Sequence, residues 1–169
     1  MNVNDIRNLY EYHYWSNEKI FKEVAKLTNQ EFTQSIAGGH SSIRNTLVHL
    51  LSAEWGWLDR CGGYKRGPSL KADDYPIFKP LLDDWNMVKE HMYTFLSQLD
   101  DKKINNYAEY SGKESKTRSM PIGELLHHVI IHGVHHRGQL AILLRELGKP
   151  TESFDILFYY AEKHGVEAW

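Results

Sequence analysis

The 169-residue chain has one cysteine, Cys61, only five prolines and no long apolar run. A lone cysteine excludes a disulfide within the chain and fits the reducing environment of the cytoplasm. The apolar stretches are far shorter than the roughly 18 residues that a membrane-spanning helix needs. The first residues also lack the apolar core of a secretory signal. We therefore expect a cytoplasmic protein without a membrane partner.

An excess of charge of one sign is also lacking, since 20 Lys and Arg residues face 22 Asp and Glu residues. Nucleic-acid-binding proteins usually show a basic excess or a basic stripe, so we expect no nucleic-acid partner. The one basic cluster, residues 113–118, is typical of a solvated loop. Length and composition suit one globular domain that spans residues 1–169.

The apolar pattern predicts four long helices. Their expected ranges are Asn4–Leu27, with Asn4 as the N-cap, Ile43–Arg60, Leu81–Leu99 and Pro121 to about Gly148. Residues 103–120 indicate a short extended excursion, such as a hairpin, and a last short helix should begin at Ser153 or Asp155 and end near Lys163. Four long helices predict an all-α four-helix bundle.

Five of the ten histidines fall within residues 127–136, on a predicted helix that is otherwise apolar nearly all round. His132 and His136 are four residues apart, so they point the same way, about 40° apart around the axis. A buried imidazole is costly unless it has a partner, and one metal ion could satisfy both rings. A third ligand from another helix would leave a position open for water or substrate. The alternatives are a histidine network closed by carboxylates or water, or a face that points at solvent.

His49 is the first candidate for that third ligand. On a helical projection it shares one side with small or polar residues, which are Ser42, Asn45, Ala53, Gly56 and Arg60. Such a side leaves room for a ligand or for close approach of another helix. Glu54 projects about 140° away from His49, which is the wrong side for a general base.

The other histidines are weaker candidates on position alone. His13 is expected at the edge of the core and His128 beside the site as a packing residue, while His91 lies among charges. His40 and His164 fall in loop and terminal segments. Position 133 is glycine, so the zincin signature with its built-in glutamate is absent. Cys61 is expected to be a buried or inert thiol.

Three blocks of this sequence resemble the DinB family of metal-binding four-helix bundles. They are Tyr14-Trp15-Ser-Asn17-Glu-Lys, Val48-His49-Leu-Leu-Ser-Ala-Glu54-Trp55 and His132-Gly-Val-His135-His136-Arg137-Gly138-Gln139, and the last is the most specific. The resemblance covers nearly the whole chain. It implies an up-down-down-up bundle, a homodimer, and metal ligation by His49, His132 and His136. Family relatives include metal-dependent transferases that use thiols such as bacillithiol or mycothiol, and many members have no assigned activity.

Together these observations favour a metalloenzyme that transfers the sulfur of a low-molecular-weight thiol to a small-molecule substrate. The reacting group at the open position would be a metal-bound water or thiolate. Imidazole accepts zinc, nickel and manganese, so the sequence does not select the metal. Two alternatives remain, a metal-dependent hydrolase and a non-catalytic, stress-related dimer that binds metal.

Overall fold

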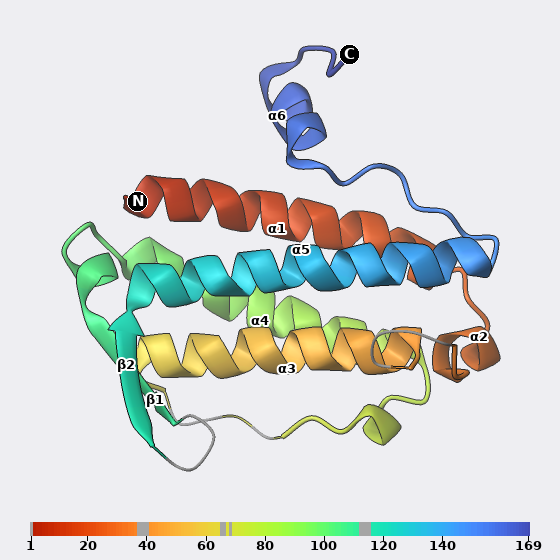
Figure 1. Ribbon diagram of the computed structural model, residues 1–169, viewed down its shortest axis with the longest axis horizontal. Helices are drawn as coiled ribbons and strands as arrows, with labels where there is room; N and C mark the ends of the chain where they lie inside the picture. The colour runs from red at the N-terminus through yellow and green to blue at the C-terminus, as the bar shows by residue number, and fades with distance from the viewer. Residues whose placement is uncertain (1, 37–40, 65–66, 68, 112–115) are drawn as a thin grey trace.

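The computed structural model describes residues 2–36, 41–64, 67, 69–111 and 116–169. Its four long helices are α1 (Val3–Val24), α3 (Ile43–Gly62), α4 (Phe78–Gln98) and α5 (Ile122–Glu146). Figure 1 shows that α1 and α5 run in one direction and α3 and α4 in the other, so the expected up-down-down-up bundle is confirmed. A long connection between α3 and α4 allows these consecutive helices to point the same way.

Shorter elements complete the chain. They are α2 (Asn29–Thr33), η1 (Ala72–Asp74), η2 (Lys103–Asn105), the antiparallel strands β1 (Tyr107–Ser111) and β2 (Thr117–Pro121), and α6 (Ile156–His164). The expected hairpin and terminal helix are thus confirmed. The hairpin lies at the end of the bundle where α3 ends and α5 begins (Figure 1). Within the described residues, every helix is too short or too polar to cross a membrane.

Several helix boundaries differ from the expected ones because of local capping. Helix α1 begins at Val3, since the side chain of Asn2, and not of Asn4, accepts the first backbone N–H groups. It ends at Val24 rather than Leu27. Helix α4 begins three residues before Leu81 and holds Pro80 in its first turn, where a missing N–H leaves no hydrogen bond unmade. Helix α3 continues past Arg60 to Gly62, and Gly63 ends it in a left-handed conformation with φ 67°.

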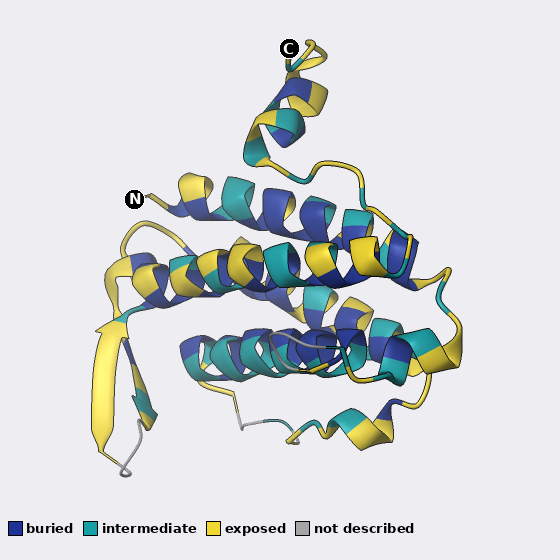
Figure 2. Cartoon of the chain, turned by 45° about the vertical axis from the view of Figure 1, so that its right-hand side comes forward, coloured by how far each residue is buried: buried dark blue, intermediate teal, exposed yellow. Residues whose placement is uncertain are grey.

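The core sits where α5 packs against α1 and α3. Leu47 and Leu51 of α3 and Leu140 and Leu144 of α5 are completely buried. Each such side chain stabilises the fold by roughly 1.5–3 kcal/mol relative to an exposed one. Figure 2 shows the same division along the helices, with buried segments turned inward and exposed ones outward. Burial of these leucines fixes the rotation of α3 and α5, so that the polar side of each helix meets the other at the surface.

Candidate metal centre

Three histidines from two helices converge between α3 and α5. The Nε2 atom of His132 lies 3.1 Å from Nε2 of His49 and 3.1 Å from Nε2 of His136. One ring nitrogen from each of the three lies within 4.8 Å of the others. Two nitrogens on a tetrahedral zinc ion, bound at about 2.0–2.1 Å, would be about 3.3 Å apart. His132 therefore has, to each of its two neighbours, the spacing of ligands around one divalent cation, and the three rings together could hold such an ion.

A hydrogen bond to a residue outside the trio determines which nitrogen of His136 carries the hydrogen. Nδ1 of His136 lies 2.7 Å from Oε1 of Gln139, one turn further along α5. A carboxamide oxygen only accepts, so Nδ1 of His136 carries the hydrogen and its Nε2 presents a lone pair. This is the arrangement in which histidines bind metals, with the second nitrogen held by an outer partner.

The central ring, His132, faces two nitrogens at once. A single N–H on its Nε2 could be directed at His49 or at His136 but not well at both. A cation between the rings would accept a lone pair from each of the three. Burial, followed by the neighbouring His136 and His49 rings, lowers the pKa of His132 from 6.5 to about 4. The ring is therefore neutral at physiological pH, as a ligand must be.

The side of the site nearest the hairpin is lined by aromatic rings. His128, one turn before His132, stacks on edge against Trp57 of α3 with centroids 5.6 Å apart. Trp57 in turn contacts Tyr110 of β1 at 5.2 Å. His128 thus packs beside the trio, as its position on the helix predicted. On the other side, the side-chain amide of Gln139 reaches His135, with Nε2 atoms 3.3 Å apart.

A buried polar network lies on the inner side of the same helices. The Arg137 guanidinium donates to Nδ1 of His13 at 3.1 Å, and Nε2 of His13 lies 3.1 Å from a Glu54 carboxylate oxygen. The Tyr14 hydroxyl donates to the other oxygen of Glu54 at 2.5 Å. Because Nδ1 accepts from Arg137, His13 is neutral and its Nε2–H donates to Glu54. The network joins α1, α3 and α5 behind the three histidines.

Gly133 explains the missing zincin glutamate. A Cβ atom at this position would lie 2.6 Å from Cε1 of His13 and 2.9 Å from Nη1 of Arg137. Real Cβ atoms do not approach neighbours so closely, so the buried network requires a glycine between His132 and His136. The close approach of α1 to α5 therefore excludes the glutamate that the zincin signature needs.

The remaining candidates lie apart from the trio. His13, expected at the core edge, is fully buried in the network, and Glu54 points inward to His13 and Tyr14, away from His49. His91 is exposed on α4, His164 ends α6, and His40 lies outside the described residues. Cys61 is buried as expected, and burial raises the pKa of its thiol to about 12.

Sequence reasoning missed the roles of Gln139, Arg137 and Tyr14. Gln139 lies on the same side of α5 as His132 and His136, and this position was the only indication of its role in the sequence. The partners of Arg137 and Tyr14 are more than 35 residues away in the chain, so no local pattern indicates them.

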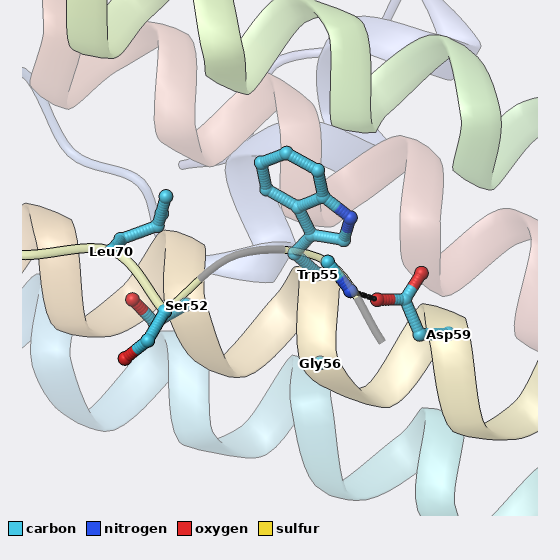
Figure 3. Close-up of a pocket in the computed structure, with 7 residues that line it drawn as sticks. Ser52, Trp55, Gly56, Asp59 and Leu70 are labelled. Atoms are coloured by element: carbon cyan, nitrogen blue, oxygen red, sulfur yellow. Dashed lines mark hydrogen bonds between the residues drawn. The ribbon is translucent and has the colours of Figure 1, made fainter. Parts of the chain in front are cut away.

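The cavity shown in Figure 3 lies on a different flank of α3. Ser52, Trp55, Gly56 and Asp59 line it together with Leu70, and the backbone N–H of Gly67 donates to Asp59 at 2.6 Å. Its volume of about 50 Å³ is well below the roughly 300 Å³ of small-molecule sites. The space suits water and not a substrate.

This chain is similar to known proteins over almost its whole length. The family model described as "DinB family" matches residues 1–165. The chain belongs to the DinB family. It is 26% identical over 158 residues to Protein DinB of Bacillus subtilis (strain 168), covering 89% of this chain and 91% of the relative.

Two further relatives agree with this family membership. The uncharacterized protein YizA of Bacillus subtilis (strain 168) is 28% identical over 144 residues, covering 82% of this chain and 85% of YizA. A crystal structure of a DinB-like protein from Bacillus cereus ATCC 10987 superposes with a TM-score of 0.69 at 25% identity, over 90% of this chain and 97% of that one. The DinB-type bundle is therefore the fold of this chain.

Proposed function

We propose that this DinB-family protein is a metal-dependent transferase that acts with a low-molecular-weight thiol. His49, His132 and His136 would hold one divalent ion, and imidazole ligands suit zinc, nickel and manganese alike. The observation that carries the proposal is the convergence of three imidazoles between α3 and α5. His49 and His132 are only half buried, so the site is open on the solvent side.

An ion at this site would act as a Lewis acid that keeps a bound thiol ionised near neutral pH. The protein supplies three neutral ligands, so the positive charge of the ion is not reduced by carboxylates. In the transfer, the thiol loses its proton, its sulfur forms a bond to an electrophilic carbon of a small molecule, and the leaving group departs with the bonding pair and a proton. The Trp57 ring, which packs on His128 next to His132, would offer an apolar wall to a substrate at this site.

The test is conjugation of bacillithiol, or of another small thiol, to 1-chloro-2,4-dinitrobenzene by protein loaded in turn with each metal. We expect metal-dependent product formation that His136→Ala abolishes. Product formation equal to that of the free metal ion, with every thiol tried, would overturn the proposal.

Metal-dependent hydrolysis is a weaker candidate because it needs a general base near the ion. Glu54, five residues beyond His49, is buried and already bonded to His13 and Tyr14. Removal of the metal by a chelator distinguishes the transferase from a non-catalytic, stress-related dimer that binds metal. A structural ion should cost a large part of the thermal stability when it is removed, whereas an open site should lose it with a modest change in Tm.

We further propose that two copies pair through the exposed side of α5. Ile131, Val134 and Ile142 lie on that side and are 55%, 38% and 62% exposed. Ile131 and Val134 also line a groove of about 670 Å³ between α1, α5 and residues 151–156. Exposed apolar residues that gather on one helix are typical of a protein interface. Ile142→Glu should convert a dimer to a monomer in analytical ultracentrifugation, whereas a monomeric parent protein would contradict the proposal.

We also propose a cytoplasmic location, since a chain with a single cysteine forms no internal disulfide and suits a reducing compartment.

A further inference from the structure

The α3 side of the candidate metal centre carries a guanidinium two turns from His49. Arg60 folds back along the helix, and its Nη1 donates to the backbone oxygen of Gly56 at 2.7 Å. Its Cζ lies 5.0 Å from the centroid of the Trp57 ring. A cation above an aromatic face and a bond to a carbonyl together hold the guanidinium in one place. Arg60 is half buried and therefore reachable from solvent.

The guanidinium lies on the same side of α3 as His49. Gly56 is seven residues beyond His49, which returns it to nearly the same angle around the helix. A Cβ atom on Gly56 would lie 2.9 Å from Nη1 of Arg60, so the guanidinium occupies the space in front of Gly56. Seven residues of helix rise about 10 Å, so the Gly56 carbonyl that holds the guanidinium lies about 10 Å along α3 from His49.

The surface between these two points is continuous. Trp57 links Arg60 to His128, and the His128 ring centroid lies 5.7 Å from that of His132. An extended ligand could therefore lie along the junction of α3 and α5, with one end at the histidines and the other at Arg60.

The charge of Arg60 is not used within the fold. Arg44, on the same helix, forms an ion pair with Asp73 at 3.0 Å, whereas Arg60 has no carboxylate at ion-pair distance among the described residues. Of the five N–H groups on a guanidinium, the bond to Gly56 occupies one, and the fork geometry of the others matches a carboxylate or a phosphate.

We propose that Arg60 is a specificity-determining residue, which selects thiols that carry an anionic group about 10 Å from the sulfur. This inference rests on the proposed thiol chemistry and adds the class of thiol. A charge-assisted bond to a pre-oriented guanidinium should improve binding of such a thiol about tenfold over a neutral one of equal length.

The experiment uses cobalt(II)-loaded full-length protein, because a thiolate on cobalt gives a charge-transfer absorption that reports binding without turnover. The probes are 8-mercaptooctanoate, its neutral analogue 8-mercapto-1-octanol, and the short acid 3-mercaptopropionate. We expect the long acid to bind about tenfold more tightly than the long alcohol. The short acid should show no gain over 2-mercaptoethanol, because its carboxylate cannot reach Arg60.

Arg60→Gln should remove the preference for the long acid and leave cobalt content and binding of the alcohol unchanged. Gly56→Ala, which displaces the guanidinium and keeps its charge, should reduce the preference. Arg145→Gln is the matched control, since Arg145 is exposed at the far end of α5, and it should have no effect. Equal binding of the long acid and alcohol by the parent protein, or an undiminished preference in Arg60→Gln, would overturn the role of Arg60. The absence of a charge-transfer band with every thiol would instead overturn the proposed thiol chemistry and this inference with it.

Discussion

The Nε2 atoms of His49 and His132 lie 3.1 Å apart although 83 residues separate the two histidines in the chain. The hairpin and the whole of α4 lie between them in sequence. The contact exists because burial of the leucines of α3 and α5 in the core fixes how each helix is rotated. In that rotation the histidines of the two helices lie next to each other. A hydrophobic core thus determines where two polar rings come together.

Loss of one ring should remove the proposed metal. His136→Ala should reduce bound metal from about one ion per chain to nearly none, because two imidazoles hold a divalent ion far more weakly than three. Elemental analysis of protein purified without a histidine tag gives the stoichiometry. His91→Ala, an exposed histidine on α4, is the control and should bind metal as the parent does. Full metal content in His136→Ala would refute the ligand assignment.

Gln139 should matter for metal affinity and little for folding. Its Oε1 accepts from Nδ1 of His136, which orients the ring and keeps its Nε2 free of hydrogen. Gln139→Leu should weaken metal binding by about 10–100-fold, the usual effect of losing such a partner. Competition with a chromophoric chelator measures the affinity. The control is Gln98→Leu, since Gln98 is an exposed residue of α4. Unchanged affinity would show that packing alone orients His136.

Two glycines on α5 should respond oppositely to alanine. Gly133→Ala should lower the free energy of unfolding by about 1–3 kcal/mol, because the new methyl group meets His13 and Arg137 in the buried network. Gly138→Ala should raise it by about 0.5–1 kcal/mol, since nothing lies within 4 Å and alanine favours the helix. Urea unfolding of both variants decides the matter, and a harmless Gly133→Ala would contradict the network's geometry.

His13 should make the metal-free protein sensitive to mild acid. Burial lowers the pKa of His13 from 6.5 and outweighs the opposing effect of Glu54, so the folded protein keeps the ring neutral. The unfolded chain binds a proton below about pH 6.5, and stability therefore falls as the pH drops through that value. In His13→Gln, Tm should fall less between about pH 7.5 and 5.5 than in the parent. Parallel Tm profiles would show that His13 does not supply this dependence.

Much of the site was predictable because helical periodicity is a local property. The four-residue spacing places His132 and His136 on one side of a helix, and the same projection turns Glu54 away from His49. The cap at Asn2 and the entry of Pro80 into α4 were misjudged because both depend on which neighbouring N–H groups need a partner.

The sequence by itself determined the helices, their order and the pair of histidines on α5, since each follows from residue spacing along a single helix. Only the tertiary structure shows that His49 reaches this pair, that the Gln139 amide orients His136, and why position 133 must be glycine. These depend on the rotation and separation of α1, α3 and α5, which the packing of distant side chains sets. Helical spacing already places Arg60 on the same side of α3 as His49, but only the structure shows that its guanidinium folds back to Gly56 and over Trp57.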